Sequence, residues 1–139
     1  MDKKKLILDF IKMQKLAVLS TVTPNNTSQS AVLEFGETED LEIIFDTFSK
    51  ARKYKNIKQN NNISLVIGWD ENITVQYEGE AEALFGKEKE KYKRKYFEKN
   101  PEAKRWENKP GMTYFRVKPA WIRYSDLNKN PWEIHEITF

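Results

Sequence analysis

The sequence predicts a mainly β domain of the α+β class: a small antiparallel barrel with helices at its periphery. Short apolar segments are separated by tight polar turns such as "TPNN", "GETED" and "DEN". The 139 residues, 39% of them hydrophobic, can bury one core and are too few for two ordinary domains. We therefore expect a single domain spanning residues 1–139.

The first half of the chain predicts a helix followed by strands. In residues 3–16, "KKKLILDFIKMQKL", apolar side chains recur at the spacing of a narrow helical stripe. Residues 16–22 and 28–35 predict a hairpin around "TPNN", and residues 41–47 a third strand. Residues 63–69, "ISLVIGW", form a nearly continuous apolar run, which is typical of a strand buried on both faces.

The second half predicts a long strand, a charged helix and a closing strand. Residues 73–85 alternate in polarity over a length that suits a strand bent around a barrel, with Gly79 at a bulge or bend. Residues 86–106 have a helical composition, and their many charges predict a solvated surface with i,i+4 pairs. Residues 112–126 predict a strand interrupted at Pro119. Only three residues of the charged helix can face inward: Tyr92, Tyr96 and Phe97.

Composition excludes several kinds of site. There is no cysteine, which excludes disulfides, thiol catalysis and thiolate metal sites. The only histidine, His135, cannot build a histidine-based metal cluster, so we expect no metal site. Lys and Arg number 24 and Asp and Glu 21, and the two signs are interspersed, so there is no long single-sign field of the kind that wraps nucleic acid.

The N-terminal segment does not predict a targeting or membrane-spanning element. Residues 1–5 are basic, but the apolar stretch after them is short and is broken by Asp9 and Lys12, with no small-residue cleavage site. No other segment approaches the length of a membrane span. We expect a cytoplasmic protein that has no membrane partner.

Residues 45–60, "FDTFSKARKYKNIKQN", concentrate basic residues directly after an apolar strand. Ser49 is a natural N-cap, so a helix is expected to start just after the strand ends at Thr47. The first N–H groups of a helix lack partners and carry the positive end of the peptide dipole. Together with Arg52, Lys53 and the Thr47 hydroxyl they predict a phosphate site.

The alternative is an ordinary cap followed by a solvated, lysine-rich helix face. Lys55 and Lys58 fit that description and are assigned to solvent. Arg52 and Lys53 are different, because basic residues at a helix start oppose the dipole unless an anion offsets them.

These motifs, in this order, resemble the pyridoxamine 5'-phosphate oxidase-like family of FMN-binding split barrels. "DTFSKARKYKNIKQNNNISLVIGW" is similar to its flavin-phosphate segment, "VQYEGEAEAL" to its bent strand, and "YFRVKPAWIRYSD" to its closing strand. The resemblance covers about residues 16–126. It implies a split β-barrel that binds FMN at the interface of a homodimer.

By position, the resemblance implies eight cofactor residues: Ser30, Ala31, Val32, Leu33, Thr47, Arg52, Lys53 and Thr74. The Arg-Lys pair would hold the FMN phosphate, with a hydroxyl from the preceding threonine. The four-residue strand segment would lie along the isoalloxazine ring through its backbone. The last threonine would reach the flavin from the second subunit.

Two departures from the family pattern matter. Ala51 replaces the serine that often precedes the Arg-Lys pair. The oxidases hold pyridoxal phosphate with a closing-strand Trp and a following Arg-x-His, whereas this chain has Tyr124-Ser125 and then "WEIHEITF". We therefore do not expect a true pyridoxamine-phosphate oxidase, and no catalytic residue is assigned. Trp106 or Trp121 is expected to line the pocket.

Three functions remain open at this point. The first is an FMN-dependent oxidoreductase that passes hydride or electrons between a nicotinamide and a small-molecule substrate. The second is a flavin-binding or storage protein without turnover. The third, less favoured because the charges are mixed, is a small basic nucleic-acid-binding barrel.

Overall fold

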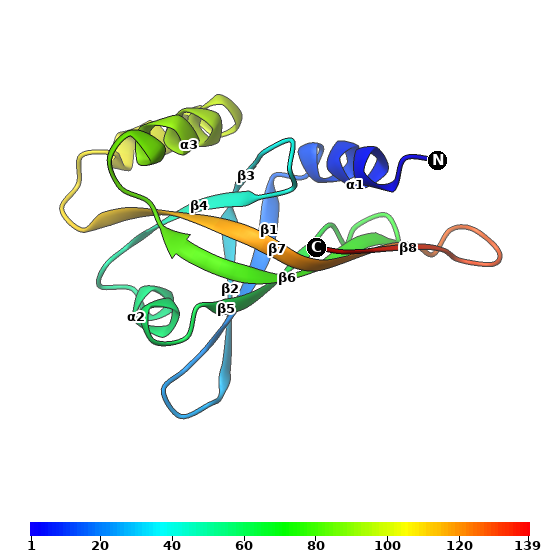
Figure 1. Cartoon of the computed structure of the whole chain (residues 1–139), viewed down its shortest axis with the longest axis horizontal. Coiled ribbons are helices and arrows are strands. Elements are labelled where there is room, and N and C mark those ends of the chain that lie inside the picture. Colours follow the sequence, from blue (N-terminus) through cyan, green and yellow to red (C-terminus); the bar gives the residue numbers. More distant parts are fainter.

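In the computed structural model, which describes residues 1–139, one antiparallel sheet curls into a half-barrel with three helices around it (Figure 1). The predicted split β-barrel class is confirmed. The helices are α1 (Lys3–Lys12), α2 (Arg52–Gln59) and α3 (Gly86–Lys99), and a 3-10 helix follows at Pro101–Trp106. The strands are β1 (Leu16–Val22), β2 (Ser28–Glu34), β3 (Gly36–Glu37), β4 (Ile43–Phe48), β5 (Asn62–Ile67), β6 (Ile73–Ala83), β7 (Met112–Asp126) and β8 (Glu133–Thr138).

The strand order in the sheet is β2-β1-β5-β6-β7-β4-β3. The long strand β7 pairs with β6 on one side, and with β4 and then β8 on the other. Strand β2 pairs only with β1, so it is an edge strand. Alternate backbone N–H and C=O groups of an edge strand point away from the sheet and are free to bind a ligand.

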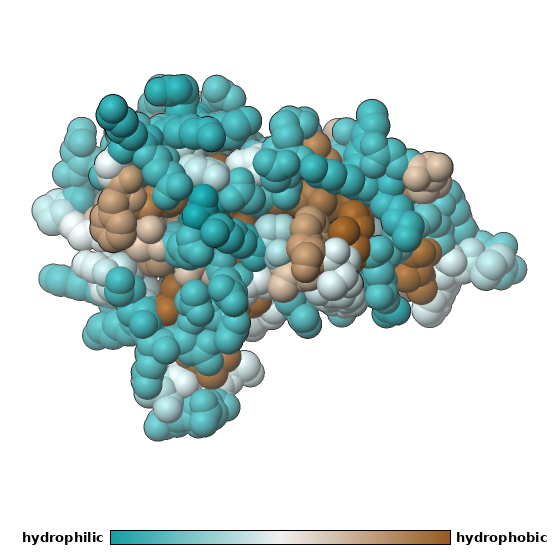
Figure 2. All heavy atoms as spheres, in the orientation of Figure 1, coloured by the Kyte–Doolittle hydropathy of each residue, from teal (hydrophilic) through white to brown (hydrophobic).

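Two apolar clusters hold the helices to the sheet. The main core lies inside the curl of the sheet, where α1 contributes Ile7, Leu8 and Ile11. Of the stripe predicted at Leu6, Ile7, Phe10 and Ile11, Leu6 and Phe10 are only partly buried, and Leu8 was not predicted. The second cluster lies under α3 and contains its three predicted inward residues, packed against Ile44 and Tyr114. The opposite surface of α3 is almost entirely hydrophilic, as expected for a solvated face (Figure 2).

The prediction that "ISLVIGW" is buried on both faces is wrong. Strand β5 alternates between buried and more exposed residues, and Val66 is 38% exposed. Strand β5 lies in the interior of the sheet, between β1 and β6, but only one face of the sheet is covered by the core. The outer face of β5 is therefore left uncovered in the single chain, and it carries Asn62, Ser64 and Val66.

Pro119 does not interrupt the closing strand, because β7 runs continuously through it. The pairing of β6 with β7 shifts between Glu78 and Gly79, which confirms the predicted irregularity at Gly79. The extra residue is Ala120 of β7, which has no partner between the pairs Glu78–Trp121 and Gly79–Pro119. Proline is tolerated there because a bulge removes the need for its missing N–H.

Three further differences concern the ends of elements. Strand β4 begins later than predicted because Leu41 takes a left-handed conformation, φ 64°, in the turn before it. The predicted helix over residues 86–106 changes from α to 3-10 geometry at Asn100 and Pro101. Strands β3 and β8 were not predicted. None of the helices combines the length and apolarity needed to cross a membrane.

Candidate functional site

The basic segment forms helix α2, but the helix begins three residues after Ser49. Ala51 occupies the N-cap position with extended backbone, and no side chain caps the first turn. The predicted cap at Ser49 is wrong, because residues 48–51 form a turn, closed by a hydrogen bond from Ala51 N–H to Phe48 O at 2.9 Å, before the helix begins. The first-turn N–H groups of α2 are therefore left without a capping side chain.

A hollow of about 520 Å³, the α2 hollow, lies between the start of α2 and strands β1 and β2. Its lining residues are Leu19, Thr21, Thr27, Ser28, Gln29, Ser30, Ala31, Arg52 and Lys53. Four of the eight predicted cofactor residues thus lie around one hollow. The basic helix start faces the edge strand β2 across it.

A second hollow of about 280 Å³, the Trp106 hollow, shares Lys53 with the first. Its lining residues are Leu33, Glu34, Asp46, Thr47, Phe48, Ala51, Lys53, Tyr96, Trp106 and Met112. Two more predicted residues, Leu33 and Thr47, lie here rather than beside Arg52. Thr47 is only 5% exposed.

The other two predicted cofactor residues lie outside both hollows. Val32 is 60% exposed and pairs across the sheet with Val18. Thr74 lies on β6 opposite Ser125 of β7. Its predicted role is to reach the flavin from a second subunit.

A hydrogen-bond relay connects Arg52 to the interior of the barrel. With its amide oxygen toward Arg52, Gln29 accepts from the guanidinium, and that oxygen lies 2.8 Å from Arg52 Nε. The Gln29 NH2 group then lies 2.7 Å from the near end of the Asn56 carboxamide, and that end is also 3.0 Å from Thr21 Oγ1. With Gln29 in this orientation, the near end is the Asn56 oxygen, which accepts from the Gln29 NH2 group and from the Thr21 hydroxyl. Because Asn56 and Thr21 are both buried, this relay fixes the position of the guanidinium at the rim.

We expect Asn56→Ala to reduce the free energy of unfolding by about 1–3 kcal/mol, because it leaves the Thr21 hydroxyl and the Gln29 amide without their buried partner. Urea unfolding followed by circular dichroism measures this. The same substitution at the exposed Asn108 is the control and should change stability by less than about 0.5 kcal/mol. Equal effects at both positions would contradict a structural relay.

The two hollows differ in their electrostatics. Neither Arg52 nor Lys53 forms an ion pair with a carboxylate of the chain. In the Trp106 hollow, Asp46 accepts from Tyr96 Oη at 3.1 Å and forms no ion pair. Burial raises the pKa of the Asp46 carboxyl, and Glu34 raises it further, whereas the Tyr96 hydrogen bond and Lys53 act in the opposite direction.

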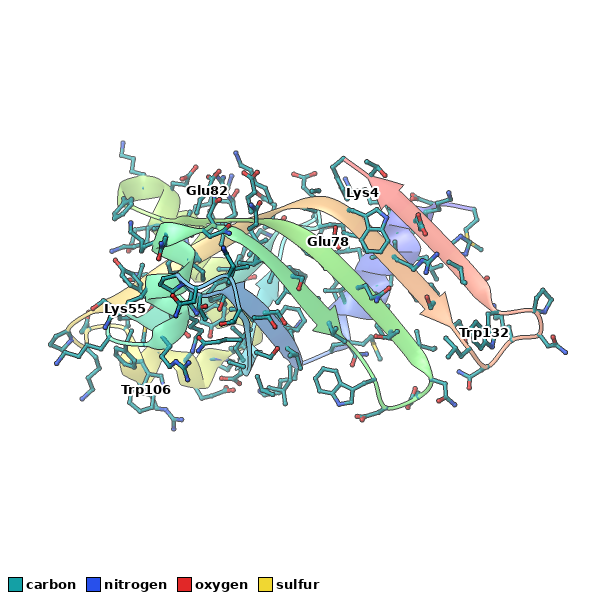
Figure 3. All side chains as sticks on the ribbon, turned by 90° about the horizontal axis from the view of Figure 1, so that it is seen from below. Lys4, Lys55, Glu78, Glu82, Trp106 and Trp132 are labelled. Carbon is teal, nitrogen blue, oxygen red and sulfur yellow. The ribbon has the colours of Figure 1, made fainter.

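Of the two tryptophans that the sequence suggested as pocket residues, Trp106 lines the second hollow. It is 39% exposed, lies edge-on to Phe48 with 6.2 Å between ring centroids, and has the Arg105 guanidinium 4.8 Å from its ring. Trp121 is part of β7 and lines neither hollow. Lys55 and Trp106 lie toward the same end of the molecule, and Trp132 lies at the opposite end (Figure 3).

Sequence reasoning did not identify Gln29 or Asp46. No local pattern marks Gln29, since its role depends on the pairing of β2 beside α2. Asp46 did carry a signal, because it is an acidic residue within the apolar run "LEIIFDT". A charged residue in a buried strand needs a partner or a function.

A curled antiparallel sheet with an uncapped basic helix beside its edge strand defines the split-barrel class described above. The sequence matches the family model described as pyridoxamine 5'-phosphate oxidase over residues 4–126, and the chain belongs to this family. No curated protein matches the chain.

Solved structures show the same fold. General stress protein 26 from Bacillus anthracis is 25% identical with a TM-score of 0.78, and the match covers 99% of this chain and 100% of that one. A heme binding protein from Mycobacterium smegmatis is 13% identical with a TM-score of 0.82, covering 93% of this chain and 55% of that one. A protein of unknown function from Agrobacterium tumefaciens is 16% identical with a TM-score of 0.81, covering 89% and 56%. The chain thus spans little more than half the length of the last two.

Proposed function

We propose that the chain binds FMN and acts as an oxidoreductase on a small molecule. The observation that carries this proposal is the uncapped start of α2, where Arg52 and Lys53, neither of them paired with a carboxylate, face a hollow along edge strand β2. Such a helix start is a favourable place for a phosphate dianion. The phosphate of FMN would fill this role.

The donor set of the α2 hollow fits the cofactor. Two cationic side chains and the first N–H groups of α2 can give charge-assisted hydrogen bonds, each worth roughly 1.5–3 kcal/mol. The free edge of β2, which includes Ser30 and Ala31, offers backbone groups to a flat ring with several acceptors and donors. When bound, FMN supplies the redox chemistry, so the chain has to bind it, orient it and set its electrostatic surroundings.

We propose further that the protein does not oxidise pyridoxamine phosphate. In place of the family's Arg-x-His, the chain continues into β8, where His135 lies opposite Tyr124. The His135 ring is mostly buried, with Nε2 3.6 Å from Glu133. The arginine at this end of β7, Arg123, is paired with Glu136 at 2.8 Å. It is a neighbour in sequence of Tyr124 rather than the register partner of His135, so Arg123 and His135 do not form the family's pair for a substrate phosphate.

The visible spectrum of freshly purified protein is the first test. Flavin bands that persist through gel filtration support FMN binding, and a Soret band in their place would count against it. Reduction of bound flavin by NADH or NADPH in a stopped-flow instrument then separates an oxidoreductase from a storage protein. Salt-dependent binding to single-stranded DNA by a colourless protein would instead support the nucleic-acid alternative.

A homodimer is part of this proposal. Val32, Val18 and Val66 are register partners across β2, β1 and β5, and so form one apolar row on the uncovered face of the sheet. Val32 and Val66 are 60% and 38% exposed. An exposed apolar row on a sheet face is typical of a two-fold interface, which would also bring Thr74 of a partner subunit to the flavin.

We expect wild-type protein to sediment as a dimer at micromolar concentration, and Val32→Glu to shift it toward monomer with weaker FMN binding, because a charge would be buried at the interface. Sedimentation velocity measures the shift. Leu127→Glu, an equally apolar exposed position outside this row, is the control and should leave the dimer intact. A monomeric wild type would contradict the dimer.

A further inference from the structure

The Trp106 hollow lies directly beside the proposed phosphate site. Lys53 lines both hollows, so a ligand in the Trp106 hollow would be a neighbour of the bound cofactor. With about 280 Å³, the hollow has room for a small ring system rather than for a second nucleotide. Its position therefore suits a substrate of the proposed flavoprotein.

The aromatic wall favours a planar ligand. Trp106 and Phe48 lie edge to face, and the Arg105 guanidinium lies 4.8 Å from the indole, so the ring is held in place, while 39% of the residue is exposed. Met112 adds a polarizable apolar side chain at the same wall. A heteroaromatic ring placed against the indole would gain both burial and stacking.

Asp46 determines the charge that the hollow prefers. Its carboxylate receives one side-chain hydrogen bond, from Tyr96, and has no cation within ion-pair distance. A carboxylate has two oxygens and about four acceptor positions, so part of its capacity is unused even with the backbone hydrogen bond that also lowers its pKa. Partly burying such a group is unfavourable, which is the reason that its pKa is raised.

The other charged groups around Asp46 do not supply the missing partner. Glu34 on β2 adds a second negative charge, and is itself paired with Lys15 at 3.4 Å. Lys53 on α2 acts on Asp46 only from a distance, and a bound phosphate would neutralise it. Tyr114 on β7 lies opposite Asp46, and its buried hydroxyl has no hydrogen-bond partner. Apart from Lys53, which a bound phosphate would neutralise, no cation lines the hollow, and no donor other than the Tyr96 hydroxyl reaches Asp46 from a side chain.

We infer that the Trp106 hollow is a substrate site that takes a planar heteroaromatic ring bearing a protonated or N–H-donating nitrogen, with Asp46 as its acceptor. This inference rests on the proposed function, because the α2 hollow would hold the anionic cofactor while the Trp106 hollow holds the cationic substrate. An anionic ring would meet two carboxylates and be excluded. This preference is opposite to that of a site for a phosphorylated vitamin.

Three quinolines of the same ring size test the charge preference. We expect 4-aminoquinoline, a cation with N–H donors, to bind wild-type protein at least tenfold more tightly than neutral quinoline, and quinoline-4-carboxylate to bind more weakly than either. Isothermal titration calorimetry measures all three. Binding of the carboxylate as tight as that of the amine would overturn the inference.

Two variants locate the preference within the hollow. Asp46→Asn, which keeps the shape of the side chain, should remove the tenfold advantage of the amine, and Trp106→Leu should weaken all the ring probes. The matched controls are Asp70→Asn and Trp132→Leu, an exposed acid and an exposed indole outside the hollow, and neither should change binding. An Asp46→Asn protein that still prefers the amine tenfold would overturn the assignment.

The pH dependence of 4-aminoquinoline binding to wild-type protein tests the same assignment, even if the Asp46→Asn variant does not fold. Affinity for 4-aminoquinoline should fall as pH is lowered through the pKa of Asp46, since the protonated acid attracts a cation less. Tyr96→Phe removes the hydrogen bond that lowers this pKa, so the midpoint of the loss should move to higher pH. An unmoved midpoint would contradict Asp46 as the acceptor.

A parallel FMN titration keeps this inference separate from the proposed function. Asp46→Asn and Trp106→Leu should bind FMN with affinity close to that of wild type, because neither residue lines the α2 hollow. Failure of wild-type protein to bind FMN would overturn the proposed function. Failure of the quinoline series in FMN-loaded protein would overturn the substrate site alone.

Discussion

Replacing both Arg52 and Lys53 with alanine is expected to weaken FMN binding by about two to four decades. Each side chain would contribute a charge-assisted contact to the phosphate worth roughly 1.5–3 kcal/mol, and the sum of about 3–6 kcal/mol corresponds to that range of dissociation constants. Fluorescence quenching of FMN on titration with protein measures the loss. Affinity would be lost even if one of the two contacts is mediated by water, because the positive charges themselves attract the phosphate dianion.

Stability and control ligands distinguish this result from general damage. Arg52 is exposed and both charges oppose the dipole of α2, which offsets the loss of the Arg52 hydrogen bond to Gln29, so the free energy of unfolding without cofactor should change little. Riboflavin, which lacks the phosphate, should bind wild type and variant equally weakly. The pair Lys55→Ala and Lys58→Ala removes the same total charge from the exposed face of α2 and should affect FMN far less. Unchanged FMN affinity in the first variant would return α2 to a lysine-rich surface helix.

The local hydrophobic pattern was sufficient to predict those strands and helices in which one face packs on the core and the other faces solvent. Residues 16–22 and 112–126 form β1 and β7 with the predicted bounds, because hydrophobic alternation and flanking turns act within the segment. Strand β5 shows the limit of that reasoning. An apolar run indicates that burial of the strand is favourable. Only the tertiary arrangement determines whether both faces of the strand are covered within one chain.

The part of the candidate site that lies at the start of α2 could be predicted from the sequence. Arg52, Lys53, Ser30 and Ala31 line one hollow. The basic segment of the sequence indicated the first two, whereas Ser30 and Ala31 were implied only by the resemblance to the family. Ser49 was a misleading signal, because it lies in the turn of residues 48–51 that precedes the helix, and the helix starts at Arg52. The Trp106 hollow joins β2, β4, α2, α3 and the 3-10 helix, so no single segment of sequence could indicate it.

Gly79 is the position where we expect the largest loss of stability from the addition of one methyl group. A Cβ atom at Gly79 would lie 2.3 Å from the Lys118 carbonyl oxygen and 3.0 Å from Val117 Cγ1. The first of these is a backbone atom of β7, which cannot turn away as a side chain can. Gly79→Ala must therefore separate β6 from β7 at the bulge, where the two longest strands of the sheet pair. We expect a loss of about 3 kcal/mol in the free energy of unfolding.

Gly86→Ala is the matched control, because a Cβ there meets nothing within 4 Å. Gly86 has φ +60°, so alanine at this position carries only the strain of the left-handed conformation, about 1 kcal/mol. Urea unfolding of both variants compares a steric clash with backbone strain under the same conditions. A smaller loss for Gly79→Ala than for Gly86→Ala would mean that β7 can shift at Ala120 without losing its pairing, and that the bulge is adaptable rather than fixed by the close backbone contact.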